Sequence, residues 1–227
     1  MLKPQKKMTR REKTHLKQDQ LVTAWFKTSD YVEKNSKFFL LGAVAVAVLI
    51  GGSYFYKWYL AQQNQQASVL FATGKQAFDN QNYDAAIDSL GKLTNKYGGT
   101  SSAGVGTIYL ANAFMQKKDY ATAERYYLAY LDDYDDDRIL SVAAAAGVAA
   151  TFEERGENAK AADLYEKAAR DYDESYRAPE LLWEAARCHR AAQNLDAARR
   201  VLGALLEKYP DSRFSEDAKL MQAELQS

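Results

Sequence analysis

Side chains suited to covalent or metal chemistry are scarce in this sequence. It has one cysteine, Cys188, and two histidines, His15 and His189. A single cysteine can form neither an intramolecular disulfide nor a cysteine-based zinc site. Cys188 and His189 are neighbours, which suggests a nucleophile and its base, but successive residues on a helix point about 100° apart. We therefore expect a packed thiol beside a surface or groove histidine.

Carboxylates are plentiful, and the densest run is DDYDDDR at residues 132–138. The run lacks the mid-loop glycine and the terminal glutamate of a calcium-binding loop. We expect it to be a solvated turn between repeats, and the acids at 153–154 and 171–174 to lie on the surface near helix ends. The sequence contains no glycine-rich phosphate loop, GxSxG turn or HExxH motif. It therefore predicts a protein that is not an enzyme and that has no cofactor and no metal ion.

The elements that would position these side chains repeat along the chain. Four segments begin with a short turn and continue into a helix that has an alanine in its first turn: DNQNYDAAIDSL (79–90), QKKDYATAERYY (116–127), ERGENAKAADLY (154–165) and AAQNLDAARRVL (191–202). Their anchoring residues lie 37, 38 and 37 positions apart, at Tyr83, Tyr120, Asn158 and Leu195. Such a constant period is the signature of a repeat architecture.

Small and large residues recur at fixed places within each repeat. An alanine follows each anchoring residue by three positions: Ala86, Ala123, Ala161 and Ala198. A large residue stands four positions beyond it: Leu90, Tyr127, Tyr165 and Leu202. The preceding helix carries a small residue: Gly74, Ala111, Ala149 and Ala186. Small residues let two antiparallel helices approach closely, and the large residue fills the space beside them.

These features resemble the tetratricopeptide repeat, whose usual period is about 34 residues. We predict an all-α fold in which residues 67–227 form an α-solenoid of about four such helix pairs, followed by a C-terminal capping helix. Pro210 would follow the last repeat helix, and Ser215 would cap the final helix, with Glu216 and Asp217 in its first turn.

Stacked helix pairs create a concave groove, and residues on the first helix of each pair that avoid the packed positions would line it. The mixture of aromatic, methionine and basic side chains suits an extended peptide or a partner helix, although Trp183 could equally pack between repeats. No carboxylate clamp is complete at these positions. The candidate residues are Phe71, Lys75, Phe78, Ile108, Asn112, Met115, Ala146, Glu153, Trp183, Arg187 and Arg190.

Before the repeats lies FFLLGAVAVAVLIGGSYFY, residues 38–56, without one charge. Nineteen residues of helix are about 28 Å long, close to the roughly 30 Å thickness of the hydrocarbon core of a bilayer. Aromatic residues cluster at its end, as in an interfacial belt. A cleaved signal and a soluble buried helix are the alternatives, and a transmembrane helix at 38–57 fits the length and the aromatic flank best. Residues 58–66 would be a linker or a continuation of this helix.

The charges on either side of this stretch predict its orientation. Residues 1–37 contain ten basic and four acidic residues, a net charge of +6, and the rest of the chain contains 20 and 26, a net charge of −6. The positive-inside rule places the N-terminal arm in the cytoplasm and the repeats outside it, which in a bacterium is the periplasm. The arm, with a short amphipathic helix at 21–32, would contact membrane lipid. Nucleic acid is not an expected partner, because no motif for binding it is present.

The arm ending WFKTSDYVEKNSK, the span and the link YKWYLAQQNQQASVLF are together similar to a bacterial family of membrane-anchored tetratricopeptide proteins, ancillary subunits of the Sec translocon. The resemblance implies binding of exported chains beside periplasmic chaperones. YPDSRFSEDA also looks like the repeats of outer-membrane assembly and cell-division coordinator proteins. We therefore expect an inner-membrane scaffold that assists protein export or chaperone hand-off. The alternative is a structural adaptor in envelope assembly or division machinery.

Overall fold

The computed structural model describes residues 33–134 and 137–226, together with residues 23, 25 and 29. His15, most of the predicted amphipathic helix and the middle of the acidic run lie outside the described residues. Within 33–134 and 137–226 there are nine helices and no strand, so the predicted all-α class is confirmed. The chain divides into two units, residues 1–60 and 61–227.

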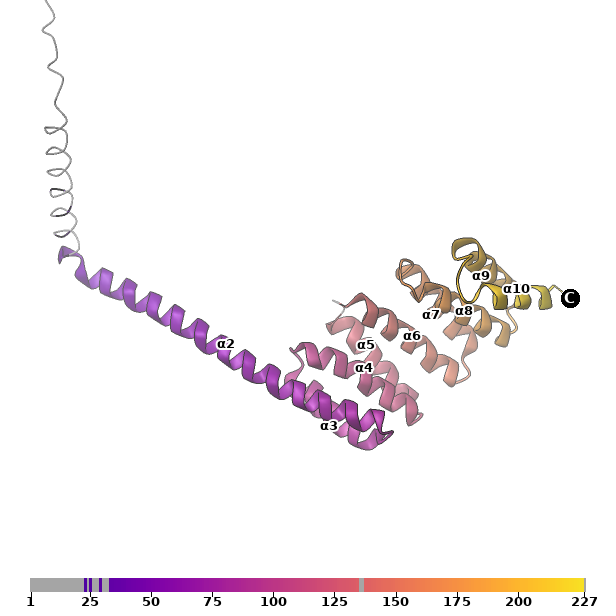
Figure 1. Ribbon diagram of the computed structural model, residues 1–227, viewed down its shortest axis with the longest axis horizontal. Helices are drawn as coiled ribbons and strands as arrows, with labels where there is room; N and C mark the ends of the chain where they lie inside the picture. The colour runs from indigo at the N-terminus through magenta and orange to yellow at the C-terminus, as the bar shows by residue number, and fades with distance from the viewer. Residues whose placement is uncertain (1–22, 24, 26–28, 30–32, 135–136, 227) are drawn as a thin grey trace, which may run out of the picture. The chain divides into compact units, whose positions relative to one another are not determined.

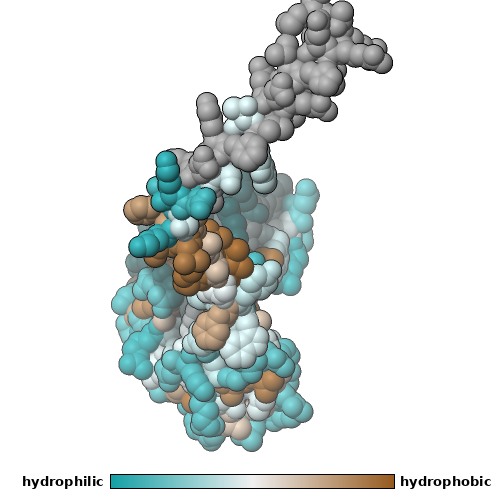
Figure 2. Space-filling view, turned by 90° about the vertical axis from the view of Figure 1, so that its left-hand side faces the viewer, coloured by the Kyte–Doolittle hydropathy of each residue, from teal (hydrophilic) through white to brown (hydrophobic). Residues whose placement is uncertain are grey.

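Helix α2 (Ser36–Asp79) supplies the described apolar part of the first unit. An 18-residue window within it has a mean hydropathy of 2.2 and no buried residue. Its apolar side chains are exposed, for example Phe38 at 75% and Leu49 at 73%. The space-filling view shows a large brown hydrophobic area next to the grey residues and smaller brown areas elsewhere (Figure 2). By length and composition this segment is able to cross a membrane. Signal sequences pass the same test.

The second unit is a stack of antiparallel helix pairs (Figure 1). The last part of α2 pairs with α3, and the next pairs are α4 with α5, α6 with α7 and α8 with α9, followed by α10. Each helix from α3 onward packs against the next, and α4 also contacts α6. The bounds of these helices are α3 (Tyr83–Tyr97), α4 (Ser101–Gln116), α5 (Tyr120–Asp133), α6 (Arg138–Glu154), α7 (Asn158–Asp171), α8 (Ala178–Ala191), α9 (Leu195–Lys208) and α10 (Ser215–Glu224).

The predicted alternation of small and large residues holds the pairs together. The four alanines and the four large residues of the repeats are all buried, as are the small residues of the facing helices. In the first pair a Cβ atom placed on Gly74 would lie 2.5 Å from Cγ of Leu90. Since real Cβ atoms essentially never come that close to another heavy atom, only glycine allows α2 and α3 this separation.

The turn inside each repeat needs a left-handed backbone. The residue two positions before each second helix has a positive φ: Gln81 at 60°, Lys118 at 61°, Gly156 at 79° and Gln193 at 61°. Only Gly156 is of the type that favours this conformation. The turns also differ in capping, because Asn82 and Asp119 cap α3 and α5 with their side chains whereas Glu157 and Asn194 form no such bond.

Tyrosines tie the turns of successive repeats together. The hydroxyl of Tyr134 donates to the carbonyl of Gly98 at 2.6 Å, and that of Tyr209 donates to the carbonyl of Asp173 at 2.7 Å. Both bonds span 36 residues, about one repeat. A half-buried donor that finds a backbone acceptor one repeat away stabilises the stacking of neighbouring pairs.

The start of α10 differs from the prediction. Ser215 is the first residue of the helix and Phe214 occupies the N-cap position, without a side-chain capping bond. The Ser215 hydroxyl instead donates to the carbonyl of Tyr209 at 3.0 Å. The serine is therefore used to tie α10 to the end of α9. The predicted acids of the first turn, Glu216 and Asp217, are in place.

Candidate peptide-binding groove

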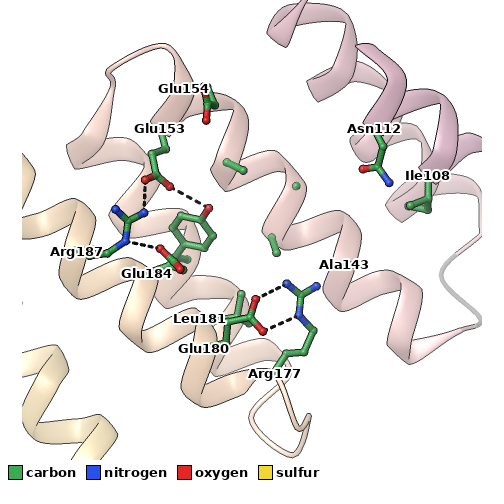
Figure 3. Close-up of a pocket in the computed structure, with 14 residues that line it drawn as sticks. Ile108, Asn112, Ala143, Glu153, Glu154, Arg177, Glu180, Leu181, Glu184 and Arg187 are labelled. Carbon is green, nitrogen blue, oxygen red and sulfur yellow. Dashed lines mark hydrogen bonds and ion pairs between the residues drawn. The ribbon is translucent and has the colours of Figure 1, made fainter. Parts of the chain in front are cut away.

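A hollow of about 480 Å³ opens on the surface formed by the first helices of repeats two, three and four (Figure 3). Helices α4 and α8 form its sides and α6 its floor, and α7 and the turn before α8 add one residue each. The lining residues are Ile108, Asn112, Ala143, Ala146, Gly147, Ala150, Glu153, Glu154, Tyr165, Arg177, Glu180, Leu181, Glu184 and Arg187.

The floor is open because the groove face of α6, before its last turn, carries only small side chains. Ala143, Ala146, Gly147 and Ala150 have the spacing i, i+3, i+4 and i+7 of one helix face. Beneath Gly147 lies the ring of Tyr127, so close that a Cβ atom would lie 2.5 Å from it. The Tyr127 hydroxyl donates to Oδ1 of Asn112, which leaves the side-chain NH2 of Asn112 as a hydrogen-bond donor on the α4 side.

The α8 side carries two separate groups of ion pairs (Figure 3). Arg177 donates to both carboxylate oxygens of Glu180, at 2.8 and 3.3 Å. Arg187 donates through Nε to Glu184 at 2.7 Å and through Nη2 to Glu153 on α6, which joins two repeats. These paired side chains form a fixed polar wall, since each is held by at least one partner.

The lining carries net negative charge, because it contains four glutamates and two arginines. The hydrogen bond from Arg177 lowers the pKa of Glu180 below its usual value, although burial opposes the shift. Burial raises the pKa of Tyr127 to about 12 and also raises that of Tyr165, whose hydroxyl donates to Glu153 at 3.2 Å. At neutral pH both hydroxyls therefore stay protonated and keep their bonds to Asn112 and Glu153, while the groove presents carboxylates at its side.

Five of the eleven candidate residues line this hollow, namely Ile108, Asn112, Ala146, Glu153 and Arg187. Sequence reasoning missed Glu180 and Glu184 on α8. A signal for them existed, because they precede Arg187 by seven and three positions and therefore share its helix face.

The other candidates lie in neighbouring clusters. Phe71 and Phe78 pack edge-on against Tyr109, with ring centroids 5.7 and 5.5 Å apart, and the Lys75 ammonium lies 5.7 Å from the centroid of the same ring. Met115 packs against the main core cluster.

The last two candidates lie on α8. Trp183 stacks on Phe214, with ring centroids 6.2 Å apart, so it packs between the fourth repeat and the turn before α10. Arg190 pairs with Glu224 of α10 at 3.2 Å.

His189 is not the surface or groove histidine that we expected. It is buried, with 4% of its surface exposed, and its Nε2 atom lies 2.7 Å from Glu166 of α7. Cys188 is packed as predicted, and burial raises the pKa of its thiol to about 12, so the thiol stays protonated at neutral pH.

Asp163, Glu166 and His189 are close enough together to ligate a metal ion. However, Arg200 donates to both oxygens of Glu166, at 2.8 and 3.0 Å. Both carboxylate oxygens therefore already bind a positively charged guanidinium, which would repel a metal cation. This arrangement does not fit a cation site.

The fold and the groove define a helical-repeat binding protein. Residues 29–178 match the tetratricopeptide repeat-like domain and residues 180–212 match the tetratricopeptide repeat. The first match covers well over half of the chain, so the protein belongs to the tetratricopeptide repeat-like family. It therefore has the architecture of a scaffold for protein–protein interaction. No curated protein sequence matches this chain.

Two solved structures are similar in fold. A tetratricopeptide repeat protein from Parabacteroides merdae has a TM-score of 0.58 at 17% identity, and the match covers 71% of this chain and 60% of that one. The apo form of RapI has a TM-score of 0.61 at 12% identity, covering 73% of this chain and 49% of that one. This chain thus spans about half to three fifths of those proteins, and at such identities the likeness shows the fold alone.

Proposed function

We propose that this protein is a single-pass membrane scaffold that binds partner polypeptides in the groove of α4, α6 and α8. The observation that carries the proposal is the alanine floor beside a fixed polar wall. Because the floor consists of small side chains, a partner segment can approach α6 closely. Asn112 and the glutamates supply hydrogen-bond groups for the backbone and side chains of the partner. Preformed ion pairs reduce the entropy that the groove loses on binding.

Residues 38–57 would hold the groove at a membrane surface. The exposed apolar face of this segment is costly in water, at about 25 cal/mol per Å² of apolar area. The family match begins at residue 29 and so includes the apolar segment together with the repeats, which favours a retained anchor over a cleaved signal. The basic arm then places the N-terminus in the cytoplasm and the repeats in the periplasm.

The partners that we propose are exported chains, the Sec translocon or periplasmic chaperones, and the function is assistance in translocation or chaperone hand-off. This step rests on the similarity of the arm, the span and the link to translocon-associated proteins. A structural adaptor of the envelope would use the same groove for one folded partner.

Photo-crosslinking from the groove floor tests the binding proposal. A photoreactive amino acid at Ala143, a half-buried floor residue, should capture polypeptides in intact membranes. The same amino acid at Leu128, an exposed residue of α5 outside the groove lining, is the matched control. Translocon subunits and nascent exported chains among the adducts would support the export role, and one stable envelope partner would support the adaptor. Equal labelling from both positions would contradict the groove as the binding site.

Reporter fusions test the topology. Alkaline phosphatase fused after Ser227 should be active and a cytoplasmic fluorescent protein at the same place should not fluoresce, because the positive-inside rule keeps residues 1–37 in the cytoplasm. The control moves the reporter to residue 1, where the pattern should reverse. A C-terminus that reports from the cytoplasm would overturn the periplasmic location.

A further inference from the structure

The groove of α4, α6 and α8 has a surplus of negative charge that its own arginines do not balance. Its lining contains four carboxylates and two guanidinium groups. Arg177 bonds both carboxylate oxygens of Glu180, and Nη2 of Arg213 lies 3.7 Å from the same carboxylate. Glu180 is therefore fully paired, and the surplus charge belongs to the other three glutamates.

One part of the surplus lies where α6 meets α8. The single guanidinium of Arg187 is shared between the carboxylates of Glu184 and Glu153, so this group of three side chains keeps a net charge of −1. The two glutamate side chains are only 27% and 24% exposed. Their charge is therefore screened less by water and salt than the charge of a surface pair.

Glu154, the last residue of α6, carries the other part of the surplus. It is exposed and accepts a hydrogen bond from the hydroxyl of Tyr120 at 3.1 Å, but no cation among the described residues pairs with it. The adjacent Arg155 is held by Glu124 and Glu157 instead. The C-terminus of a helix is also the negative end of its dipole, which favours a cation at this place.

The floor of the groove provides a surface for the stem of a cationic side chain. Ala143, Gly147 and Ala150 precede Glu154 by eleven, seven and four positions, so all four lie on one face of α6. Lysine and arginine pack their hydrocarbon stems on apolar surface while the charged head reaches a polar partner. The floor therefore leads such a stem toward a carboxylate that lacks a cation.

The opposite side of the groove favours an extended backbone. Asn112 lies there on α4, and its side-chain NH2 is a hydrogen-bond donor (Figure 3). The interior carbonyls of a helix already accept hydrogen bonds from their own helix. An extended segment keeps its carbonyls available for this donor.

We propose that the groove binds an extended segment of a partner polypeptide that carries a lysine or an arginine, with the cationic head at the end of the floor where Glu153 and Glu154 lie. The inference rests on the polypeptide-binding function proposed above and adds the class of segment that is bound. The same carboxylates repel an acidic segment, so the groove selects its partners by charge.

Photo-crosslinking of defined peptides to the full chain in detergent tests this charge preference. The photoreactive amino acid is again at Ala143, which is about 16 Å from Glu154 along α6, a distance that about five extended residues span. The probes are two biotinylated decapeptides of serine, threonine and valine, one with two lysines and the other with two glutamates at the same positions. Since one surface ion pair adds up to about fivefold in affinity and a like charge removes a similar factor, capture of the lysine peptide below saturation should be about 5- to 25-fold greater. Added salt should reduce this ratio.

Substitutions of Glu154 and of a matched glutamate locate the preference. Glu154→Lys should bring the capture ratio below about twofold, and Glu154→Gln, which keeps an acceptor for Tyr120, should lower it by about two- to fivefold. Glu207 is an exposed glutamate in the last turn of α9, outside the groove lining. Glu207→Lys changes the total charge equally and should leave the ratio unaltered. Far-ultraviolet circular dichroism checks that all the variants keep their helices.

Equal capture of the two peptides, stronger capture of the glutamate peptide or no capture of either would overturn the inference, as would an equal effect of Glu154→Lys and Glu207→Lys. The polypeptide-binding function fails on a different result, namely equal labelling from Ala143 and Leu128 in intact membranes. A groove that passes the membrane test and fails the peptide test binds polypeptides, but it does not select them by positive charge.

Discussion

Replacing Leu90 with alanine should lower the free energy of unfolding of the repeats by about 2–5 kcal/mol. Leu90 has no exposed surface, and its Cγ and Cδ2 atoms fill the space above Gly74. The truncation leaves a cavity between α2 and α3 that the two helices cannot close completely. Urea unfolding of the full chain in detergent, followed by circular dichroism, measures the loss. Hydrogen exchange should show that the loss of stability falls mainly on the first repeat, because each repeat contacts only its neighbours.

Gly74→Ala sharpens this prediction through a double-mutant cycle. Alone, the added methyl group meets Leu90 at 2.5 Å, and this clash should lower the free energy of unfolding by about 1–3 kcal/mol. The higher helix propensity of alanine offsets about 1 kcal/mol of that loss. Combined with Leu90→Ala, the methyl group enters the vacated space, so the double variant should be more stable than the sum of the two by about 0.5–3 kcal/mol.

Gly91→Ala is the control, because a Cβ atom placed on that glycine of α3 would meet nothing within 4 Å beyond its own stretch of helix. This substitution should stabilise the protein by up to about 1 kcal/mol. Additive effects of Gly74→Ala and Leu90→Ala would contradict the proposed packing of α2 on α3.

Glu166→Ala should destabilise the repeats by about 1–3 kcal/mol at neutral pH. The Glu166 carboxylate is 10% exposed and accepts hydrogen bonds from Arg200, while its Oε1 atom also lies 2.7 Å from Nε2 of His189. Among the described residues, Nδ1 of His189 is a buried atom that already has no partner. Removal of the carboxylate leaves the second ring nitrogen without its partner as well. We place the cost below that of a fully buried ion pair because Arg200 is 62% exposed and can return to water.

The same substitution should change how stability depends on pH. Burial raises the pKa of Glu166, but the bonds from Arg200 and His189 outweigh it and hold the pKa below the usual value. A carboxylate whose pKa is lowered by folding stabilises the folded state fully at pH values above its pKa in the unfolded chain, which is about 4.3. This stabilisation is lost as the pH falls through the pKa of the folded state. The difference in unfolding free energy between the two proteins should therefore narrow between pH 5 and pH 3, roughly the window around that unfolded value.

Asp171→Ala on the same helix, an exposed i, i+4 partner of Lys167, should change stability by no more than about 0.5 kcal/mol. A difference between Glu166→Ala and the unaltered chain that stays constant down to pH 3 would contradict the role of the carboxylate.

The period of the repeats made the fold predictable. Small residues such as Ala86 and large residues such as Tyr127 recur every 37 or 38 positions, and each choice has a local physical reason, the approach of two adjacent helices. Such contacts join segments close in sequence, so the pattern alone specifies them. The left-handed turn residues Gln81, Lys118 and Gln193 recur with the same period, but their types do not reveal the conformation, because neighbouring packing imposes it against their preference.

The groove was only partly predictable. The sequence predicted that the first helix of each pair lines the groove. It also predicted Asn112 and Arg187 as lining residues, because these two avoid the packed positions. Whether an exposed side chain lines a hollow or meets an aromatic ring depends on its neighbour one repeat away. Phe71 and Phe78 therefore pack against Tyr109 and do not line the groove. Trp183 packs against Phe214.

By itself the sequence determined the helical repeats, the packed positions and a segment long and apolar enough to cross a membrane, since periodicity, residue size and hydropathy are local properties. The tertiary structure decided the rest. It brought Glu153 to Arg187 and buried His189 against Glu166, because the stacking of one helix pair on the next sets which side chains meet and which remain open to a partner.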